Sequence, residues 1–177
     1  TDGTPYADPN ALGRAVVAAA HDAGVRITLL DTCYLQADVT GAALTGVQRR
    51  FDDHDWKAWA RRVDQLVDDE KTRVGVAIHS VRAVPTEGIA GLAAYADERA
   101  LPLHVHLSEQ PAENTACLAH HGVTPTRLLA DHGVLGPRTT AVHATHLTDD
   151  DIALLGDSGT TISMCCTTER DLADGVG

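Results

Sequence analysis

The amino-acid sequence predicts an α/β protein whose parallel strands form part of a (β/α)8 barrel. Short, nearly continuous apolar strands alternate with helical patterns along the chain, which is typical of a parallel sheet covered on both faces. Three of the predicted strands end in polar residues such as histidine, as expected at the rim of a barrel enzyme. Five strands are predicted where a closed barrel has eight, so we expect part of such a barrel.

An open, flavodoxin-like sheet would also accommodate five strands and is the structural alternative. No glycine-rich phosphate loop follows any predicted strand, which weakens a nucleotide-binding version of that sheet. The 177 residues suffice for one ordinary domain.

Local patterns predict each element in turn. Asp8 can cap a first helix over 9–23, with Pro9 in its first turn, an apolar stripe that includes Leu12 and Val16, and Gly24 as its end. A buried strand follows over 25–34, and the polar, glycine-bearing segment 36–50 indicates a lid or binding loop. Further helices are predicted over 53–71, 86–99, 112–121, 125–132 and 148–157, and further strands over 74–80, 103–107, 140–144 and 160–166.

Helix boundaries are marked by residues with a known preference for them. Thr86 and Thr148 are suitable N-caps, and Asp151 follows Thr148 by three residues. Gly122 and Gly133 close two successive helices.

Composition limits the partners and the compartment. The net charge is −11, from 14 basic and 25 acidic residues, so we expect no nucleic-acid partner. No apolar run reaches the length of a membrane span, and no signal peptide is apparent, so we expect a cytoplasmic protein without a membrane partner. The four cysteines show no zinc-knuckle or redox spacing, and we expect them to be buried in a reducing compartment.

The strand 103–107 carries the most informative residues. His104 and His106 are two apart, so both leave the same face of the strand, and His106 lies nearer the rim. Imidazole is the most common zinc ligand, and a catalytic zinc takes about three protein ligands. Glu109 can accept a proton from a water molecule there. Alternatively, it can cap the next helix and interact favourably with the dipole of that helix. These residues predict metal-assisted hydrolysis.

The neighbouring strands add further polar residues. His143 lies inside an apolar strand and is the better candidate for the pocket, whereas His146 is expected to lead into the following loop. His79 ends another strand, and Arg82 follows it by three residues. Arg82 can bind a substrate carboxylate or pair with one of the acidic side chains.

Three sequence blocks resemble the amidohydrolase superfamily, in its branch of metal-dependent aminohydrolases. They are residues 104–114 (H-V-H-L-S-E-Q-P-A-E-N), 139–148 (T-T-A-V-H-A-T-H-L-T) and 167–175 (T-T-E-R-D-L-A-D-G). The shorter matches at 6–9 (Y-A-D-P), 48–51 (Q-R-R-F) and 78–84 (I-H-S-V-R-A-V) favour a member that acts on an amidine carbon. The resemblance covers nearly the whole chain.

The resemblance implies a role for five residues. His106 is implied to be a metal ligand, Glu109 the proton shuttle, and His143 a hydrogen-bonding partner of the attacking hydroxide or the tetrahedral centre. His79 and Arg82 are implied to hold the glutamyl part of a substrate, and His104 is not a ligand in the family pattern. One divalent metal ion is implied as cofactor, zinc or alternatively iron.

The implied reaction is hydrolysis of N-formimidoyl-L-glutamate to N-formyl-L-glutamate and ammonia, a step of histidine degradation. The partner is then a small-molecule substrate, and we expect a homodimer. Two alternatives stay open: a related aminohydrolase that deaminates a purine, pyrimidine or triazine ring, and a non-catalytic barrel fragment.

The chain departs from the family pattern in two respects. A first-strand H-x-H pair and an eighth-strand aspartate are not among the 177 residues, and Cys166 stands where the family usually has proline. We therefore expect residues 1–177 to be the central part of a single barrel domain, with about strands 3 to 7 present and strands 1, 2 and 8 absent.

Overall fold

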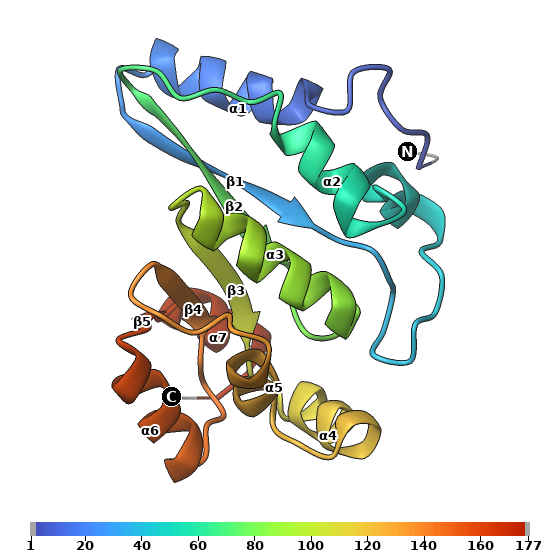
Figure 1. The fold of residues 1–177 in the computed structure, drawn as a ribbon, viewed down its shortest axis with the longest axis vertical. Helices are drawn as coiled ribbons and strands as arrows, with labels where there is room; N and C mark the ends of the chain where they lie inside the picture. Colours follow the sequence, from blue (N-terminus) through green and yellow to red (C-terminus); the bar gives the residue numbers. More distant parts are fainter. Residues whose placement is uncertain (1–2, 176–177) are drawn as a thin grey trace.

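The computed structural model describes residues 3–175, which form one parallel sheet with helices packed on it (Figure 1). The strands pair in the order β1-β2-β3-β4-β5, and every pairing is parallel. The predicted α/β class is confirmed, and Thr1 and Gly177, where the chain begins and stops, lie outside the described residues. The strands are β1 (Ile27–Cys33), β2 (Thr72–Ile78), β3 (Leu103–Leu107), β4 (Thr139–His143) and β5 (Thr161–Ser163).

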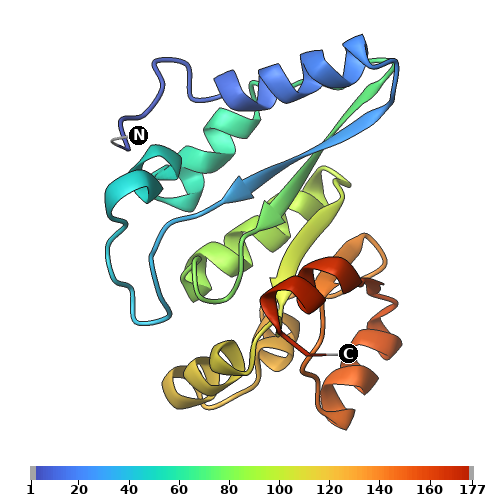
Figure 2. The same ribbon diagram turned by 180° about the vertical axis from the view of Figure 1, so that it is seen from behind.

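Helices follow the strands in alternation. Figure 1 shows α3 in front of the sheet beside β2 and β3, and Figure 2 shows α7 on the opposite side, near β4. The helices are α1 (Ala11–Asp22), α2 (Trp56–Val63), α3 (Thr86–Glu98), α4 (Pro111–His121), α5 (Pro125–Asp131), α6 (Asp149–Ser158) and α7 (Cys166–Leu172), with a 3-10 helix η1 (Gly46–Phe51) in the predicted loop.

The core lies between the sheet and the helices that cover one of its faces. On β3, Leu103, Val105 and Leu107 are buried, whereas His104 and His106 alternate with them and are half-buried. The two histidines therefore share the other face of the strand, as period-2 alternation predicts. This face is the one that a barrel turns inward.

Close packing between α2 and α3 depends on a glycine. A Cβ atom at Gly91 would lie 2.5 Å from the ring of Trp56, so only glycine lets the indole approach the α3 backbone. The neighbouring Trp59 is fully buried and meets Tyr95 edge to face, with ring centroids 5.3 Å apart.

Most of the predicted helix ends are observed. Thr148 and Asp151 form a reciprocal capping box at the start of α6. Gly122 ends α4 in the left-handed conformation, with φ 75°, and Gly133 follows α5 with φ 73°. Thr86, in contrast, is the first residue of α3 rather than its cap, which is Pro85.

Helices α1 and α2 also differ from the prediction. Helix α1 has Asn10 rather than Asp8 as its N-cap, although the Asp8 carboxylate accepts the Asn10 backbone N–H at 3.0 Å. Helix α2 ends at Val63 instead of 71. Beyond it, the carboxylates of Asp68 and Asp69 accept the backbone N–H groups of Val74 and Thr72, so this stretch is used to fix the start of β2.

The last predicted strand is also too long. Strand β5 ends at Ser163, and α7 begins at Cys166. The Glu169 carboxylate accepts the Cys165 backbone N–H at 2.9 Å, and this contact turns the chain out of the sheet. Cys166 is the first helical residue and is exposed, and Cys165 is half-buried, so the expected burial of all four cysteines was wrong for these two.

No helix within residues 3–175 combines the length and the hydropathy needed to cross a membrane.

Candidate active site

Three histidine rings lie in a row at the carboxyl ends of β2, β3 and β4. The ring centroids of His79 and His106 are 5.1 Å apart, and those of His106 and His143 are 5.6 Å apart. The parallel topology explains the row, because neighbouring parallel strands end at the same edge of a sheet. The structure thus brings together three residues that the sequence predicts for one site.

His106 is held so that one ring nitrogen is free to bind. Its Nδ1 lies 2.6 Å from the backbone carbonyl of His79, and a carbonyl can only accept, so Nδ1 carries the hydrogen. The lone pair of the neutral ring is then on Nε2, for which no hydrogen bond is recorded within residues 3–175. A backbone carbonyl that fixes the tautomer in this way is typical of metal-binding histidines.

His143 reaches the row through an unusual backbone. Its partner across the strands is Leu107, whose side chain is buried, so simple alternation would turn His143 toward the helices. The φ angles of His143 and Ala144 are instead 71° and 54°, in the left-handed region. This turn at the strand end places the His143 ring beside His106, with 24° between the ring planes.

Two carboxylates flank the His143 ring. Its Nε2 lies 3.5 Å from Oε1 of Glu109, and its Nδ1 lies 3.3 Å from Oε1 of Glu169. His143 and Glu169 are 7% and 6% exposed, whereas Glu109 is 18% exposed. Glu109 is therefore the carboxylate that can exchange a proton with a bound molecule.

Glu109 does not serve as a helix cap. Helix α4 begins at Pro111, and its N-cap is Gln110. Ser108, just before Glu109, has φ 48°, so the chain turns sharply at the end of β3. This turn leaves the Glu109 carboxylate beside the histidines rather than on the helix.

Arg82 is paired within the protein. Its Nε lies 3.1 Å from Oε2 of Glu113, which is 2% exposed, while Oε1 of Glu113 accepts the Ser108 backbone N–H at 2.9 Å. The Arg82 side chain is 37% exposed, and no partner is recorded for its Nη atoms within residues 3–175. The guanidinium is therefore oriented through Nε and still presents two nitrogen atoms to a ligand.

His79 is a neutral ring at pH 7. Burial lowers the pKa of its imidazole to about 4, and the nearby His106 and Arg82 act in the same direction. Its ring lies 4.6 Å from that of Tyr34, whose hydroxyl accepts a hydrogen bond from Gln48 at 2.8 Å. His79 can therefore offer a hydrogen bond to a substrate but no positive charge.

The remaining histidines predicted near the rim are placed apart from this row. Nε2 of His146 donates to the backbone carbonyl of Asp174 at 2.6 Å, in agreement with its expected place in the loop. His104 lies one layer below His106 on the same face, and burial lowers the pKa of its imidazole.

Sequence reasoning missed several residues of the site. Glu113 and Glu169 lie in the blocks 104–114 and 167–175, but neither block alone indicates which side chain it contacts. Gln36 and Gln48 connect the segment 36–50 to the site, since Gln36 donates to the Arg82 carbonyl at 3.2 Å and Gln48 to Tyr34. The sequence of that segment carries no pattern that indicates these contacts.

A cluster of metal-type ligands is centred on His143. Within residues 3–175, the one such group of three comprises His143, Cys165 and Glu169, whose candidate ligand atoms lie within 4.8 Å of one another. His106 is not in this group. Each of the three side chains already has a hydrogen-bond partner, since the Cys165 thiol lies 3.7 Å from the Ser163 carbonyl.

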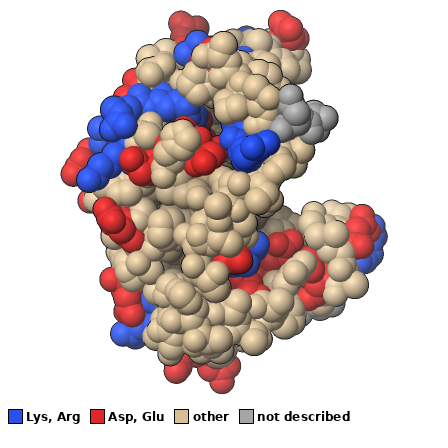
Figure 3. All heavy atoms as spheres, turned by 90° about the vertical axis from the view of Figure 1, so that its right-hand side faces the viewer, with Lys and Arg blue, Asp and Glu red and all other residues tan. Residues whose placement is uncertain are grey.

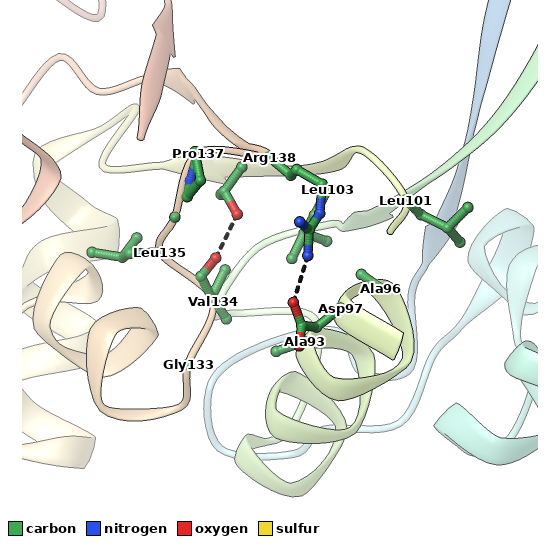
Figure 4. Close-up of a pocket in the computed structure, with 12 residues that line it drawn as sticks. Ala93, Ala96, Asp97, Leu101, Leu103, Gly133, Val134, Leu135, Pro137 and Arg138 are labelled. Carbon is green, nitrogen blue, oxygen red and sulfur yellow. Dashed lines mark hydrogen bonds and ion pairs between the residues drawn. The ribbon is translucent and has the colours of Figure 1, made fainter. Parts of the chain in front are cut away.

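A pocket of about 330 Å³ lies at the opposite ends of the strands (Figure 4). It is bounded by Leu103 and Thr139, the first residues of β3 and β4, and the Asp97–Arg138 ion pair crosses it. Enzymes of this architecture bind their ligands at the carboxyl ends of the strands. We therefore do not assign the catalytic function to this pocket.

The space-filling view shows a notch on one side of the molecule, with acidic and basic side chains on its inner wall (Figure 3). The protein as a whole is acidic, with a net charge of −11.

Comparison with protein families shows to which family the chain belongs. The model described as "Amidohydrolase family" matches residues 3–176. The chain belongs to the amidohydrolase family. The fold and the resemblance seen in the sequence blocks are thus confirmed, and the five strands are part of the amidohydrolase barrel.

Relatives of this amidohydrolase include two named deaminating enzymes. Formimidoylglutamate deiminase of Pseudomonas aeruginosa is 34% identical over 99% of the chain and 39% of the relative. The 5-methylthioadenosine/S-adenosylhomocysteine deaminase of Nitratidesulfovibrio vulgaris is 33% identical over 60% of the chain and 24% of the relative. The chain spans about two-fifths of the length of the first of these.

A solved structure supports the architecture. The crystal structure of an amidohydrolase from Brucella melitensis superimposes with a TM-score of 0.89 at 34% identity, over 98% of this chain and 39% of that one. The order and pairing of the five strands therefore belong to a known amidohydrolase arrangement.

Proposed function

We propose that this amidohydrolase hydrolyses the formimidoyl C–N bond of N-formimidoyl-L-glutamate, producing N-formyl-L-glutamate and ammonia. The observation that carries the proposal is the grouping of His106, Glu109 and His143 at the strand ends. The 34% identity to a formimidoylglutamate deiminase over 99% of the chain supports the choice of substrate. The proposal includes a cytoplasmic role in histidine degradation.

One residue of the site, His106, fits a divalent metal ion, and zinc is the ion proposed. His106 offers Nε2, because its Nδ1 is occupied by the His79 carbonyl. Neutral imidazole is a preferred zinc ligand, and a catalytic zinc needs further ligands that are not grouped with His106 within residues 3–175. When bound, the ion would make an attacking water molecule more acidic.

Glu109 performs the proton transfers in the proposed reaction. Its carboxylate accepts a proton from water as the water oxygen forms a bond to the formimidoyl carbon, which becomes tetrahedral. Glu109 returns this proton to the terminal nitrogen of the cationic formimidoyl group, which has become an amine, and then accepts the proton of the new hydroxyl group as its oxygen forms the formyl carbonyl. The C–N bond breaks with its electron pair on nitrogen, ammonia leaves, and Glu109 gives the second proton to solvent. The partial exposure of Glu109 gives it access to both the water and the substrate.

The neighbouring side chains bind and orient the substrate. Nε2 of His143 is positioned beside Glu109 to form a hydrogen bond at the reacting centre. Arg82 binds a glutamyl carboxylate through its Nη atoms, and the buried Glu113 keeps the guanidinium in place. His79 contributes a neutral hydrogen-bonding group.

Deamination of a purine nucleoside is the second candidate. The relative from Nitratidesulfovibrio vulgaris favours it, although the match covers only 60% of the chain. Arg82 is already paired with Glu113, so the arginine could be retained even when the substrate has no carboxylate for it to bind.

Substrate competition in the full-length, metal-loaded protein tests the proposal. We expect ammonia release from N-formimidoyl-L-glutamate with a kcat/KM far above that for 5′-methylthioadenosine. Arg82→Met should lower the first kcat/KM by about 10- to 150-fold, from the 1.5–3 kcal/mol of a charged hydrogen bond, and leave the second unchanged. Arg127→Met, which removes an exposed arginine of α5, is the control. Preferential turnover of the purine substrate would overturn the proposal.

A further inference from the structure

The contacts of Glu169 assign it a function that its sequence position does not reveal. Glu169 lies on α7 and is buried, yet it is a carboxylate and so needs partners for its charge. One oxygen, Oε1, accepts two hydrogen bonds, from the backbone N–H of Cys165 at 2.9 Å and from Nδ1 of His143 at 3.3 Å. Glu169 therefore connects the end of β5 to the histidine at the end of β4.

We propose that Glu169 is the positioning residue of His143, fixing its tautomer and its ring orientation for the reaction at Nε2. The inference rests on the proposed function for the step it serves, but not for the contact itself. Glu169 touches neither substrate nor reacting atoms, and it acts only through the imidazole.

The tautomer follows from hydrogen-bond chemistry. An ionised carboxylate only accepts, so the His143 nitrogen that faces Glu169 must carry a hydrogen. In the neutral ring, Nε2 is then the acceptor, and it is the nitrogen that faces Glu109. Nε2 can thus take a hydrogen bond from the attacking water while Glu109 accepts its proton.

The orientation also needs support, because the backbone of His143 is in the left-handed region. His143 pairs with Leu107 of β3, but the pairing of β4 with β5 stops at Val142. The ring is instead held between His106, at a centroid distance of 5.6 Å, and the Glu169 carboxylate. Glu169 is itself oriented by the Cys165 N–H, which donates to the same carboxylate oxygen.

A second metal site is the competing explanation of the same cluster. His143, Cys165 and Glu169 are the right residue types, but the candidate ligand atoms are already engaged in hydrogen bonds with each other or with the backbone. A bound ion would have to displace the His143–Glu169 bond. The observed contacts therefore favour positioning over coordination.

The test combines kinetics with nitrogen NMR on the full-length, metal-loaded protein. Glu169→Gln keeps the shape of the side chain but removes the charge, and we expect kcat to fall by about 10- to 100-fold, as for residues that orient metal-site histidines. KM should change by less than about threefold, since Glu169 does not touch substrate. Glu169→Asp should recover part of kcat, and Asp171→Asn, an exposed carboxylate of the same helix, should have no effect.

The 15N shifts of the His143 ring give a readout independent of turnover. In the wild type we expect Nδ1 to be protonated and Nε2 to be the acceptor, and Glu169→Gln should shift this balance. Unchanged shifts together with unchanged kcat would overturn the proposal, and so would a zinc equivalent that is lost in Cys165→Ala. If the wild type releases no ammonia from N-formimidoyl-L-glutamate, the proposed function fails, while the NMR result still decides the role of Glu169.

Discussion

The Glu109 side chain combines two properties at the scale of a single residue. Its Oε1 lies 3.5 Å from Nε2 of His143, so its position is defined. The side chain is 18% exposed, so it can reach a bound molecule. A general acid–base group needs both, because it must be oriented and must also exchange protons.

Replacing this carboxylate should affect turnover rather than binding. We expect Glu109→Gln to lower kcat by about 10²- to 10⁴-fold, the usual contribution of a positioned proton carrier, with KM nearly constant. Steady-state assays of ammonia release measure the change, with the exposed Glu98→Gln of α3 as control. A variant with full turnover would rule out the shuttle role.

His79 should make stability depend on pH. The pKa of its buried ring is about 4, below the 6.5 of an ordinary histidine, so between these values the unfolded chain binds the proton more readily. The free energy of unfolding should therefore be highest above pH 6.5 from this group and fall as the pH drops toward 4. Urea titrations of the metal-free protein at several pH values measure this free energy of unfolding. His79→Gln should flatten the curve in this range, and parallel curves would contradict the assignment.

At the scale of elements, a buried ionic network joins α1, β1 and α2. Arg62 on α2 makes paired hydrogen bonds of 2.7–2.8 Å with Asp31 of β1, and its Nε and Nη2 each lie 2.7 Å from the carboxylate of Asp53. It also donates to the Asn10 side chain at the start of α1. Because Arg62 is 13% exposed, its loss leaves two nearly buried carboxylates without a cation.

Arg62→Ala should thus destabilise the fold by about 3–5 kcal/mol, as expected when one partner of a buried ion pair is removed. The adjacent Arg61→Ala is the matched control, since Arg61 is exposed, and it should change stability by less than about 0.5 kcal/mol. Denaturant midpoints compare the two, and equal midpoints would show that the network contributes nothing.

The elements that the sequence predicts are those fixed by local chemistry. Nearly continuous apolar runs located all five strands. Thr148 and Gly122 marked their helix ends because each acts within a few residues. The end of α2 and the start of α7 could not be predicted in this way. They depend on the carboxylates of Asp68 and Glu169, whose hydrogen bonds reach over several residues to the backbone.

The same distinction applies to the site. The closeness of His79 and His106 follows from parallel topology and could be expected from the sequence. The position of His143 beside His106 depends in addition on the left-handed turn of its own backbone. The pairing of Arg82 with Glu113 joins residues 31 positions apart, and no local pattern encodes it. Their assigned roles in catalysis and binding stay predictions until the variants are measured.

At the scale of the whole molecule, both outer strands have a free edge in the sheet of residues 3–175. Strand β1 pairs with β2 and β5 pairs with β4, and neither has a second neighbour there. Apolar residues near these edges are exposed, with Val16 of α1 at 52% and Ile162 of β5 at 45%. Unpaired edges with apolar side chains are templates for association.

Residues 1–177 expressed alone should therefore self-associate, despite the net charge of −11. Light scattering coupled to gel filtration gives the mass, and Ile162→Lys should reduce association by placing a charge on the β5 edge. A monodisperse monomer at high concentration would show that the edges are protected.

The left-handed backbone at Ser108, His143 and Ala144 lowers thermal stability at the rim of the candidate active site. Each of these residues carries a conformational penalty of about 1–2 kcal/mol that glycine would not have. Substitution by glycine at these positions would raise thermal stability. At position 143, however, it would also remove the imidazole. The conformational strain at His143 therefore has to be kept, whereas glycine at Ser108 or Ala144 would relieve strain without removing the imidazole.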